Sequence, residues 1–289
     1  MHGKPLILLG VLGAVAIVYL VIFLNGLLQA RRDGEGLPSV GSIATGFGTN
    51  FLDTLGIGSF ATSISIFKFC NMVPDELIPG TLNTGHTLPV ILQAFIYVSV
   101  IEVDFVTLVL MIVSAVLGGW FGAGLVARLP RRAVQIGVGC ALLVAVGVMT
   151  VSQMGMFPAG GTAIALRSWR LLAAVVGTFV FGAISTLGVG LYAPIMTLVS
   201  LLGMNPIAAF PIMMGSGAFL MPVASARFIW KKAYFAPVAA GLAMGGLLGV
   251  PLAAFVVKSL PLTALRYLVI GSVLYASVLM LRPALRSRP

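Results

Sequence analysis

Residues 46–59 read GFGTNFLDTLGIGS, and residues 177–190 read GTFVFGAISTLGVG. Both stretches lie in strongly apolar surroundings, and both interrupt the apolar pattern with a Gly-x-Gly. In the first, Asn50, Asp53 and Thr54 are spaced so that a helix would present them on one face. An ionisable residue in a membrane-type segment is costly and usually has a function. We therefore interpret the two stretches as the tips of membrane-dipping helical hairpins that hold a small solute near the bilayer midplane.

The composition is that of a polytopic membrane protein. Of the 289 residues, 60% are hydrophobic and only 8% are charged, which excludes an ordinary soluble domain. The formal net charge is +10, but the basic residues lie in short loops between apolar runs, where they set topology. We therefore expect no nucleic-acid partner. Cys70 and Cys140 lie far apart without metal-ligand spacing, so neither a metal nor a cofactor is expected.

Two apolar segments, residues 40–69 and 171–202, are longer than the roughly 20 residues that one crossing needs. These are the segments that contain the glycine breaks. Breaking the first at residues 56–58 leaves arms of about 16 and 12 residues, and each arm suits half a membrane. The run 6–28 is too long for a signal-peptide core and lacks a cleavage pattern before Arg31, so we expect a retained spanning helix.

The chain repeats itself at an offset of 132 residues, where the Thr-Leu-Gly-x-Gly of residues 54–58 recurs at 186–190. Pro74, Pro79 and Gly85 recur at the same offset, and the glycine pair 118–119 recurs at 245–246 after a five-residue shift. So many glycines and prolines in one register indicate duplication. We divide the chain into an extra N-terminal helix with a basic loop (1–39), a first repeat of one hairpin and three helices (40–152), and a second repeat (171–284). Together they would form one transport domain.

Loop charges predict the orientation of the two copies. If both long segments crossed the membrane, the 17 basic residues would divide 7 against 10. If both segments dip in and return, the division is 12 against 5, which obeys the positive-inside rule. The prediction is thus an all-α protein with seven spanning helices, two re-entrant hairpins and a cytoplasmic C-terminus. Because each repeat then has three crossings, the second repeat is inverted relative to the first.

At these residues the sequence resembles the sulfite exporter TauE/SafE family of membrane anion transporters. The resemblance runs from about residue 41 to the end. The family's marks are a Leu-Gly-x-Gly near the start of each half, a proline element after it, and a late glycine cluster. They correspond here to residues 55–58 and 187–190, 74–84 and 206–216, and 118–119 and 245–246. Ser59 and Leu191 stand where the family usually has a further glycine.

The resemblance implies movement of sulfite, a sulfonate or a related organic anion across a bacterial inner membrane, coupled to the proton gradient. The partners would be a small anion, the lipid bilayer and protons, and association into a homo-oligomer is left open. Two alternatives belong to other classes. An integral-membrane enzyme would need more reactive groups than one embedded Asp and one embedded His. An assembly or scaffold protein has no need of inverted, broken helices. We therefore expect a transporter and not an enzyme.

The predicted substrate site combines backbone amides with a polar stripe. Broken helices expose N-terminal amides, whose positive dipole end attracts anions without any Lys or Arg. The alternative is that the glycines only let helices pack closely. Asn83, His86 and Thr87 share one helix face. The expected substrate-binding residues are Asn50, Gly56, Gly58, Ser59, Asn83, Thr84, His86, Gly188, Gly190 and Ser216.

Asp53 and His86 are the candidates for carrying a coupling proton, since they are the titratable residues of the predicted site. Each also has a structural interpretation. The Asp53 carboxylate could accept hydrogen bonds from the backbone of its own break, and His86 could be a core histidine bonded to a neighbouring carbonyl. We interpret Met213, Met214 and Met221 as core-filling residues and expect no metal path there.

Overall fold

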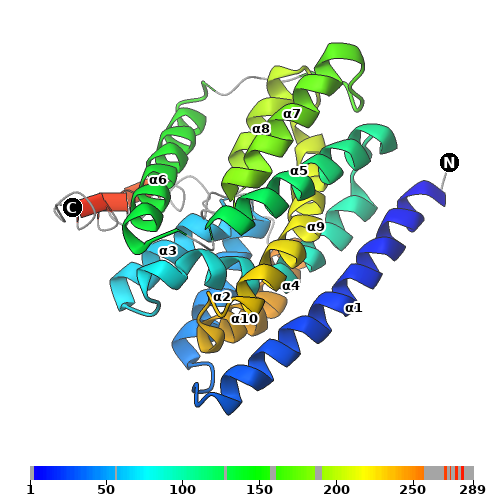
Figure 1. The fold of residues 1–289 in the computed structure, drawn as a ribbon. Helices are drawn as coiled ribbons and strands as arrows, with labels where there is room; N and C mark the ends of the chain where they lie inside the picture. Colours follow the sequence, from blue (N-terminus) through cyan, green and yellow to red (C-terminus); the bar gives the residue numbers. More distant parts are fainter. Residues whose placement is uncertain are drawn as a thin grey trace.

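The computed structural model describes residues 3–55, 57–126, 129–156, 161–185, 191–256, 270, 271, 274, 277, 278, 281 and 282. In this described part the predicted all-α class is confirmed (Figure 1). The helices are α1 (Gly3–Arg32), α2 (Val40–Thr54), α3 (Ser59–Cys70), η1 (Asp75–Leu77), α4 (Ile78–Val100), α5 (Phe105–Val126), α6 (Arg131–Gln153), α7 (Ser168–Ser185), α8 (Tyr192–Leu201), η2 (Pro206–Ala208), α9 (Ala209–Trp230) and α10 (Ala236–Val256).

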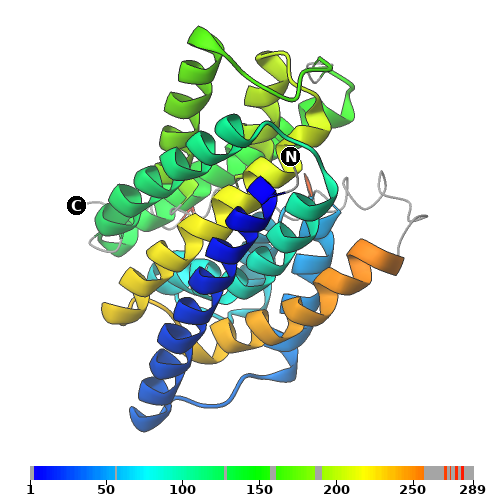
Figure 2. The same cartoon turned by 90° about the vertical axis from the view of Figure 1, so that its right-hand side faces the viewer.

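Five of the described helices are long and apolar enough to cross a membrane: α1, α5, α7, α9 and α10. A membrane location therefore follows from the structure as well as from the composition. Helices α4 and α6 form where crossings are predicted but are not among these five. The predicted number of crossings consequently stays a prediction. Figures 1 and 2 show α1 along the outside of the bundle, where it packs on α4 and α9.

Local sequence signals set the bounds of the first hairpin, which consists of α2 and α3. Ser39 caps α2 by accepting a hydrogen bond from the Ser42 amide at 3.1 Å. Helix α3 ends at Asn71, whose left-handed backbone (φ 49°) is one that asparagine tolerates. Pro79 lies in the first turn of α4, where its missing N–H is not needed.

Each half of the chain begins with a pair of helices whose outer ends meet. In the first hairpin, Thr45 near the start of α2 lies 3.9 Å from the Met72 sulfur, just beyond α3. In the second hairpin, α7 and α8, the segment before α7 pairs with the segment after α8. The Gly161 amide donates to the Met204 carbonyl at 2.9 Å, and a β-bridge joins Ala163 to Met204. The chain thus begins and ends each hairpin at one end of the bundle.

The two long central helices, α4 and α9, occupy equivalent positions in the two halves and run antiparallel. Their contacts proceed from the start of α4 to its end, and from the end of α9 to its start: Gly80 with Phe228, Thr87 with Ser225, Val90 with Gly217, and Tyr97 with Phe210. The two helices that the predicted repeat makes equivalent therefore point in opposite directions.

The late glycine pairs let the helix that follows the central helix of each half, α5 or α10, approach the other half. A Cβ atom added at Gly118 of α5 would overlap the Phe179 carbonyl of α7, and one at Gly245 of α10 would overlap the Ile43 carbonyl of α2. Helix α5 also packs on α9, and α10 packs on α4. Because each half contributes a helix to the core of the other, the two repeats form one body.

Charged side chains gather at the two ends of this body. Helices α4 and α10 begin together, since the Phe235 amide donates to Thr81 Oγ1 at 2.9 Å. Helix α5 begins where α4 ends, so its start marks the opposite end. Among the described residues, two ion pairs lie beside the starts of α4 and α10: Lys232–Asp33 at 2.6 Å and Lys68–Asp75 at 2.7 Å. Another, Arg167–Asp104 at 3.2 Å, lies beside the start of α5.

Candidate functional site

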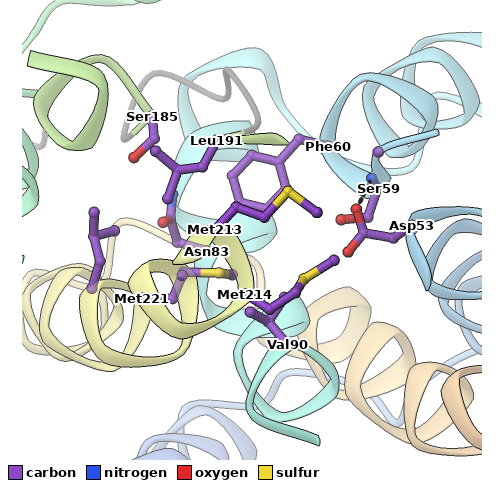
Figure 3. A pocket seen from close by; sticks show the side chains of 13 residues that line it. Asp53, Ser59, Phe60, Asn83, Val90, Ser185, Leu191, Met213, Met214 and Met221 are labelled. Atoms are coloured by element: carbon purple, nitrogen blue, oxygen red, sulfur yellow. Dashed lines mark hydrogen bonds between the residues drawn. The ribbon is translucent and has the colours of Figure 1, made fainter. Parts of the chain in front are cut away.

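A cavity of about 60 Å³ lies between the two hairpins (Figure 3). The second hairpin contributes Ser185 and Leu191, which flank residues 186–190. At the offset of 132 residues, Ser185 is the counterpart of Asp53. The first break and the two residues that flank residues 186–190 therefore border the same space. The described lining comprises Asp53, Gly58, Ser59 and Phe60 of the first hairpin, Asn83 and Val90 of α4, Ser185 and Leu191 of the second hairpin, and Met213, Met214, Gly217, Leu220 and Met221 of α9.

The first break is built around Gly58 and Asp53. Helix α2 ends at Thr54, and Gly58 has φ 92° and ψ 133°, a conformation that glycine adopts without steric cost. Helix α3 starts at the next residue, Ser59, whose amide donates to Asp53 Oδ1 at 2.8 Å. The carboxylate therefore spans the break and holds the first amide of α3. Figure 3 shows it beside Ser59 at the edge of the cavity.

His86 connects α4 to both arms of the first hairpin. Its Nδ1 lies 3.0 Å from Asn50 Oδ1, and its Nε2 lies 2.9 Å from Ser63 Oγ. The Asn50 amide donates to the Gly46 carbonyl at 2.7 Å, so Asn50 Oδ1 is an acceptor and the His86 Nδ1 carries the hydrogen. Ser63 then donates to Nε2. Both ring nitrogens are occupied, and the fully buried ring lies behind the cavity wall.

A second set of polar contacts fixes the end of α2 against α4. Gln93 Nε2 donates to Thr54 Oγ1 at 2.9 Å, and the Tyr97 hydroxyl donates to the Thr54 carbonyl at 2.6 Å. The sequence analysis missed Tyr97, although it follows Gln93 by one helical turn. It also missed Ser63, because a lone serine in an apolar helix gives no signal that separates a packing role from a functional one. Ser185 was not among the predicted site residues, although the repeat makes it the counterpart of Asp53.

The predicted substrate-binding residues fall into three groups. Gly58, Ser59 and Asn83 lie in the cavity wall together with Asp53. Four others are buried and are not among the lining residues: Asn50, Thr84, His86 and Ser216. Gly56, Gly188 and Gly190 lie outside the described residues. Residues of the first break and of α4 therefore line one cavity. His86 lies outside the lining and holds the two arms of the first hairpin against α4.

No family model, no curated protein and no solved structure matches this chain. The likeness to the TauE/SafE family therefore rests on the motif residues quoted above. The methionines interpreted as core filling, Met213, Met214 and Met221, line the cavity. Within the described residues, no cluster of three or more His, Cys, Asp or Glu side chains could hold a metal ion.

The described cavity wall contains one charged side chain, Asp53, and no Lys or Arg. Asp53 is 7% exposed and forms no ion pair within the described part of the chain. Buried charges are normally paired with an opposite charge or bound to a metal. A bound anion would therefore have only the amide end of α3 and neutral groups to attract it, and the ionised carboxylate would repel it. The site suits a small solute whose binding is tied to neutralisation of Asp53.

Proposed function

We propose that this chain is a secondary transporter that moves a small anion across the membrane, with the anion held between the two hairpins. The observation that supports the proposal is that the first break and the residues flanking 186–190, Ser185 and Leu191, border one cavity. In transporters built from inverted repeats, the substrate lies near the midplane, between discontinuous helices of the two repeats. An enzyme or a scaffold has no need of this arrangement. The likeness to the TauE/SafE family favours sulfite, a sulfonate or a related organic anion as the substrate.

The proposed membrane arrangement has seven spanning helices and two re-entrant hairpins, with the C-terminus in the cytoplasm of a bacterial cell. Three structural features support it. Helices α4 and α9 run antiparallel, as the central helices of inverted repeats must. Each hairpin begins and ends at one end of the body. Lys68 and Lys232 lie at the end that carries most of the predicted cytoplasmic charge.

Cysteine labelling is expected to place Arg31 and the end of α3 on the same, cytoplasmic face. Cys70 is exposed just beyond Lys68, so the Cys140→Ser variant keeps a native reporter at the end of the first hairpin. Arg31→Cys and, as the contrasting control, Arg167→Cys would be made in a background that also lacks Cys70. An impermeant maleimide added to intact cells should label only the Arg167 position. Labelling that separates Arg31 from Cys70 would show that residues 40–69 cross the membrane and would contradict the inverted arrangement.

The substrate itself is tested by uptake into proteoliposomes. The purified chain would be offered sulfite, thiosulfate, sulfoacetate, taurine and simple carboxylates, with and without a pH gradient. We expect saturable uptake of at least one sulfur-containing anion, faster when a gradient is imposed. Empty liposomes are the control for leakage. Failure to take up or exchange any of these anions, by a protein that remains folded and inserted, would contradict the proposed function.

A further inference from the structure

The polar atoms that the cavity wall offers to a ligand are mainly hydrogen-bond acceptors. Asn83 is 1% exposed and lines the cavity. Its Nδ2 donates to the Pro79 carbonyl at 2.8 Å, and its Oδ1 has no partner. A carbonyl can only accept, so the amide orientation is fixed and Oδ1 is the free atom. A buried acceptor without a donor is costly and rare, so Asn83 Oδ1 points to something that a ligand supplies.

The neighbouring groups have the same character. The Ser185 hydroxyl donates to the Gly182 carbonyl at 2.8 Å, so what it presents to the cavity is oxygen lone pairs. The Asp53 carboxylate accepts the Ser59 amide, also interacts with the side chains of Ser59 and Gln93, and has no ion-pair partner within the described residues. Three methionine thioethers on α9 complete this electron-rich wall (Figure 3).

The break in the first hairpin adds backbone charge of both signs. The carbonyl end of α2 lies on one side of it and the amide end of α3 on the other. A helix carries partial negative charge at its carbonyl end, and unwound segments with such ends hold Na⁺ in many transporters. The cavity therefore offers a cation one carboxylate, neutral oxygens and a helix carbonyl end.

We propose that this cavity binds a monovalent alkali cation at Asp53, with water joining it to Asn83 Oδ1. Hard cations prefer oxygen ligands, and the single carboxylate matches a single positive charge. A proton on Asp53 would neutralise the carboxylate but brings no hydration shell of its own, whereas an alkali ion orders waters whose hydrogens can reach Asn83 Oδ1. A cavity needs a volume of roughly 10–15 Å³ to hold one water molecule. The cavity, at about 60 Å³, thus has room for an ion with a few waters.

The role of this cation rests on the proposed function, whereas its binding does not. By neutralising Asp53 beside the amide end of α3, the cation removes the repulsion that an arriving anion would meet. Cation and anion would then bind with positive cooperativity and move together. Because the cation can be titrated without any anion substrate, a failure of the cation site and a failure of anion transport can be told apart.

The test is the thermal unfolding of the purified full chain in NaCl, KCl or N-methylglucamine chloride at equal ionic strength, without any sulfur anion or carboxylate. An alkali salt at ten times its dissociation constant should raise Tm by about 3–5 °C over N-methylglucamine. The comparison of Na⁺ with K⁺ shows which of the two ion sizes the cavity binds better. Equal Tm values in the three salts would overturn the proposal. So would stabilisation by acid pH alone, which would identify the ion as a proton.

Two variants test whether Asp53 and Asn83 form the cation site. Asp53→Asn should lose the shift while keeping the parent's Tm in N-methylglucamine, which shows that it is folded, and Asn83→Leu should weaken the ion's apparent affinity. The matched control is Asp75→Asn. Asp75 is as buried as Asp53, at 7% exposed, but it is paired with Lys68 outside the cavity, so its variant should keep the shift. A shift that survives in Asp53→Asn would place the ion elsewhere and contradict the proposal.

Discussion

Replacing Gly58 with leucine is expected to abolish anion uptake while leaving membrane insertion intact. Gly58 lines the cavity directly before α3, and a Cβ atom added there meets nothing within 4 Å. The leucine side chain would therefore extend into the space between the hairpins, which measures about 60 Å³. Uptake into proteoliposomes should fall by roughly tenfold or more, since each loss of about 1.4 kcal/mol in binding lowers affinity tenfold.

The matched control for this prediction is Gly34→Leu. Gly34 has the same φ of 92° as Gly58, and a Cβ there also meets nothing within 4 Å, but it lies in the exposed loop before α2. Both variants place a side chain on a residue with positive φ, which costs about 1–3 kcal/mol. Only Gly58→Leu fills the cavity, so uptake should differ between the two while stability does not. Parent-like uptake by Gly58→Leu would show that this glycine serves the chain break alone. Gly190 lies outside the described residues.

The bounds of the first hairpin were predictable because they depend on backbone demands that are visible in sequence. Arms were expected on either side of residues 56–58 within the segment 40–69, and α2 and α3 are Val40–Thr54 and Ser59–Cys70. Gly58 has a positive φ, and Gly118 of α5 and Gly245 of α10 lie where any side chain would collide with a neighbouring backbone. Such residues would keep their register through a duplication, and the repeat was predicted from them.

The direction in which each polar side chain points was not predictable. Asn83, His86 and Thr87 share a face of α4, which indicated one polar stripe. Helix α4 is surrounded, however, and neighbouring positions on it reach different partners. Thr87 contacts Ser225 of α9 at 3.0 Å, whereas His86 contacts Asn50 of α2 at 3.0 Å. On a helix that is packed on several sides, a polar stripe shows only that these residues are buried. Which of them faces a cavity depends on the helices packed around it.

The extra N-terminal helix was predicted to precede the repeats, and its contact with them could not be read from sequence. The Tyr19 hydroxyl, at the middle of α1, donates to the Thr84 carbonyl of α4 at 2.7 Å. A single tyrosine in a 30-residue apolar helix resembles an ordinary packing residue. The bond is possible because a backbone carbonyl has two lone pairs, so the Thr84 oxygen can accept the Tyr19 hydroxyl in addition to a helical amide.

Replacing Asp53 with asparagine is expected to preserve anion exchange and to remove its acceleration by an imposed cation or pH gradient. In the parent, the Ser59 amide donates to Asp53 Oδ1 at 2.8 Å. Asparagine has the same shape and keeps an oxygen that can accept this bond, so the conformation of the break should be retained. What is lost is the negative charge at the cavity. Since coupling requires that charge to be neutralised in each cycle, exchange at zero gradient should continue and driven uptake should fall to the exchange rate.

The stability of this variant provides an independent check. Asp53 has no ion-pair partner within the described residues, so Asp53→Asn should change the free energy of unfolding little. Asp75→Asn breaks the 2.7 Å pair with Lys68 and should cost about 1.5–3 kcal/mol, yet it should leave coupling intact. The measurements are counterflow at zero gradient, uptake under inward Na⁺ and pH gradients, and thermal unfolding.

If Asp53→Asn still responds to the gradients as the parent does, Asp53 only stabilises the conformation of the break and His86 becomes the candidate for coupling. If both Asp53→Asn and His86→Gln respond normally, the anion gradient or the membrane potential drives transport without a bound coupling ion.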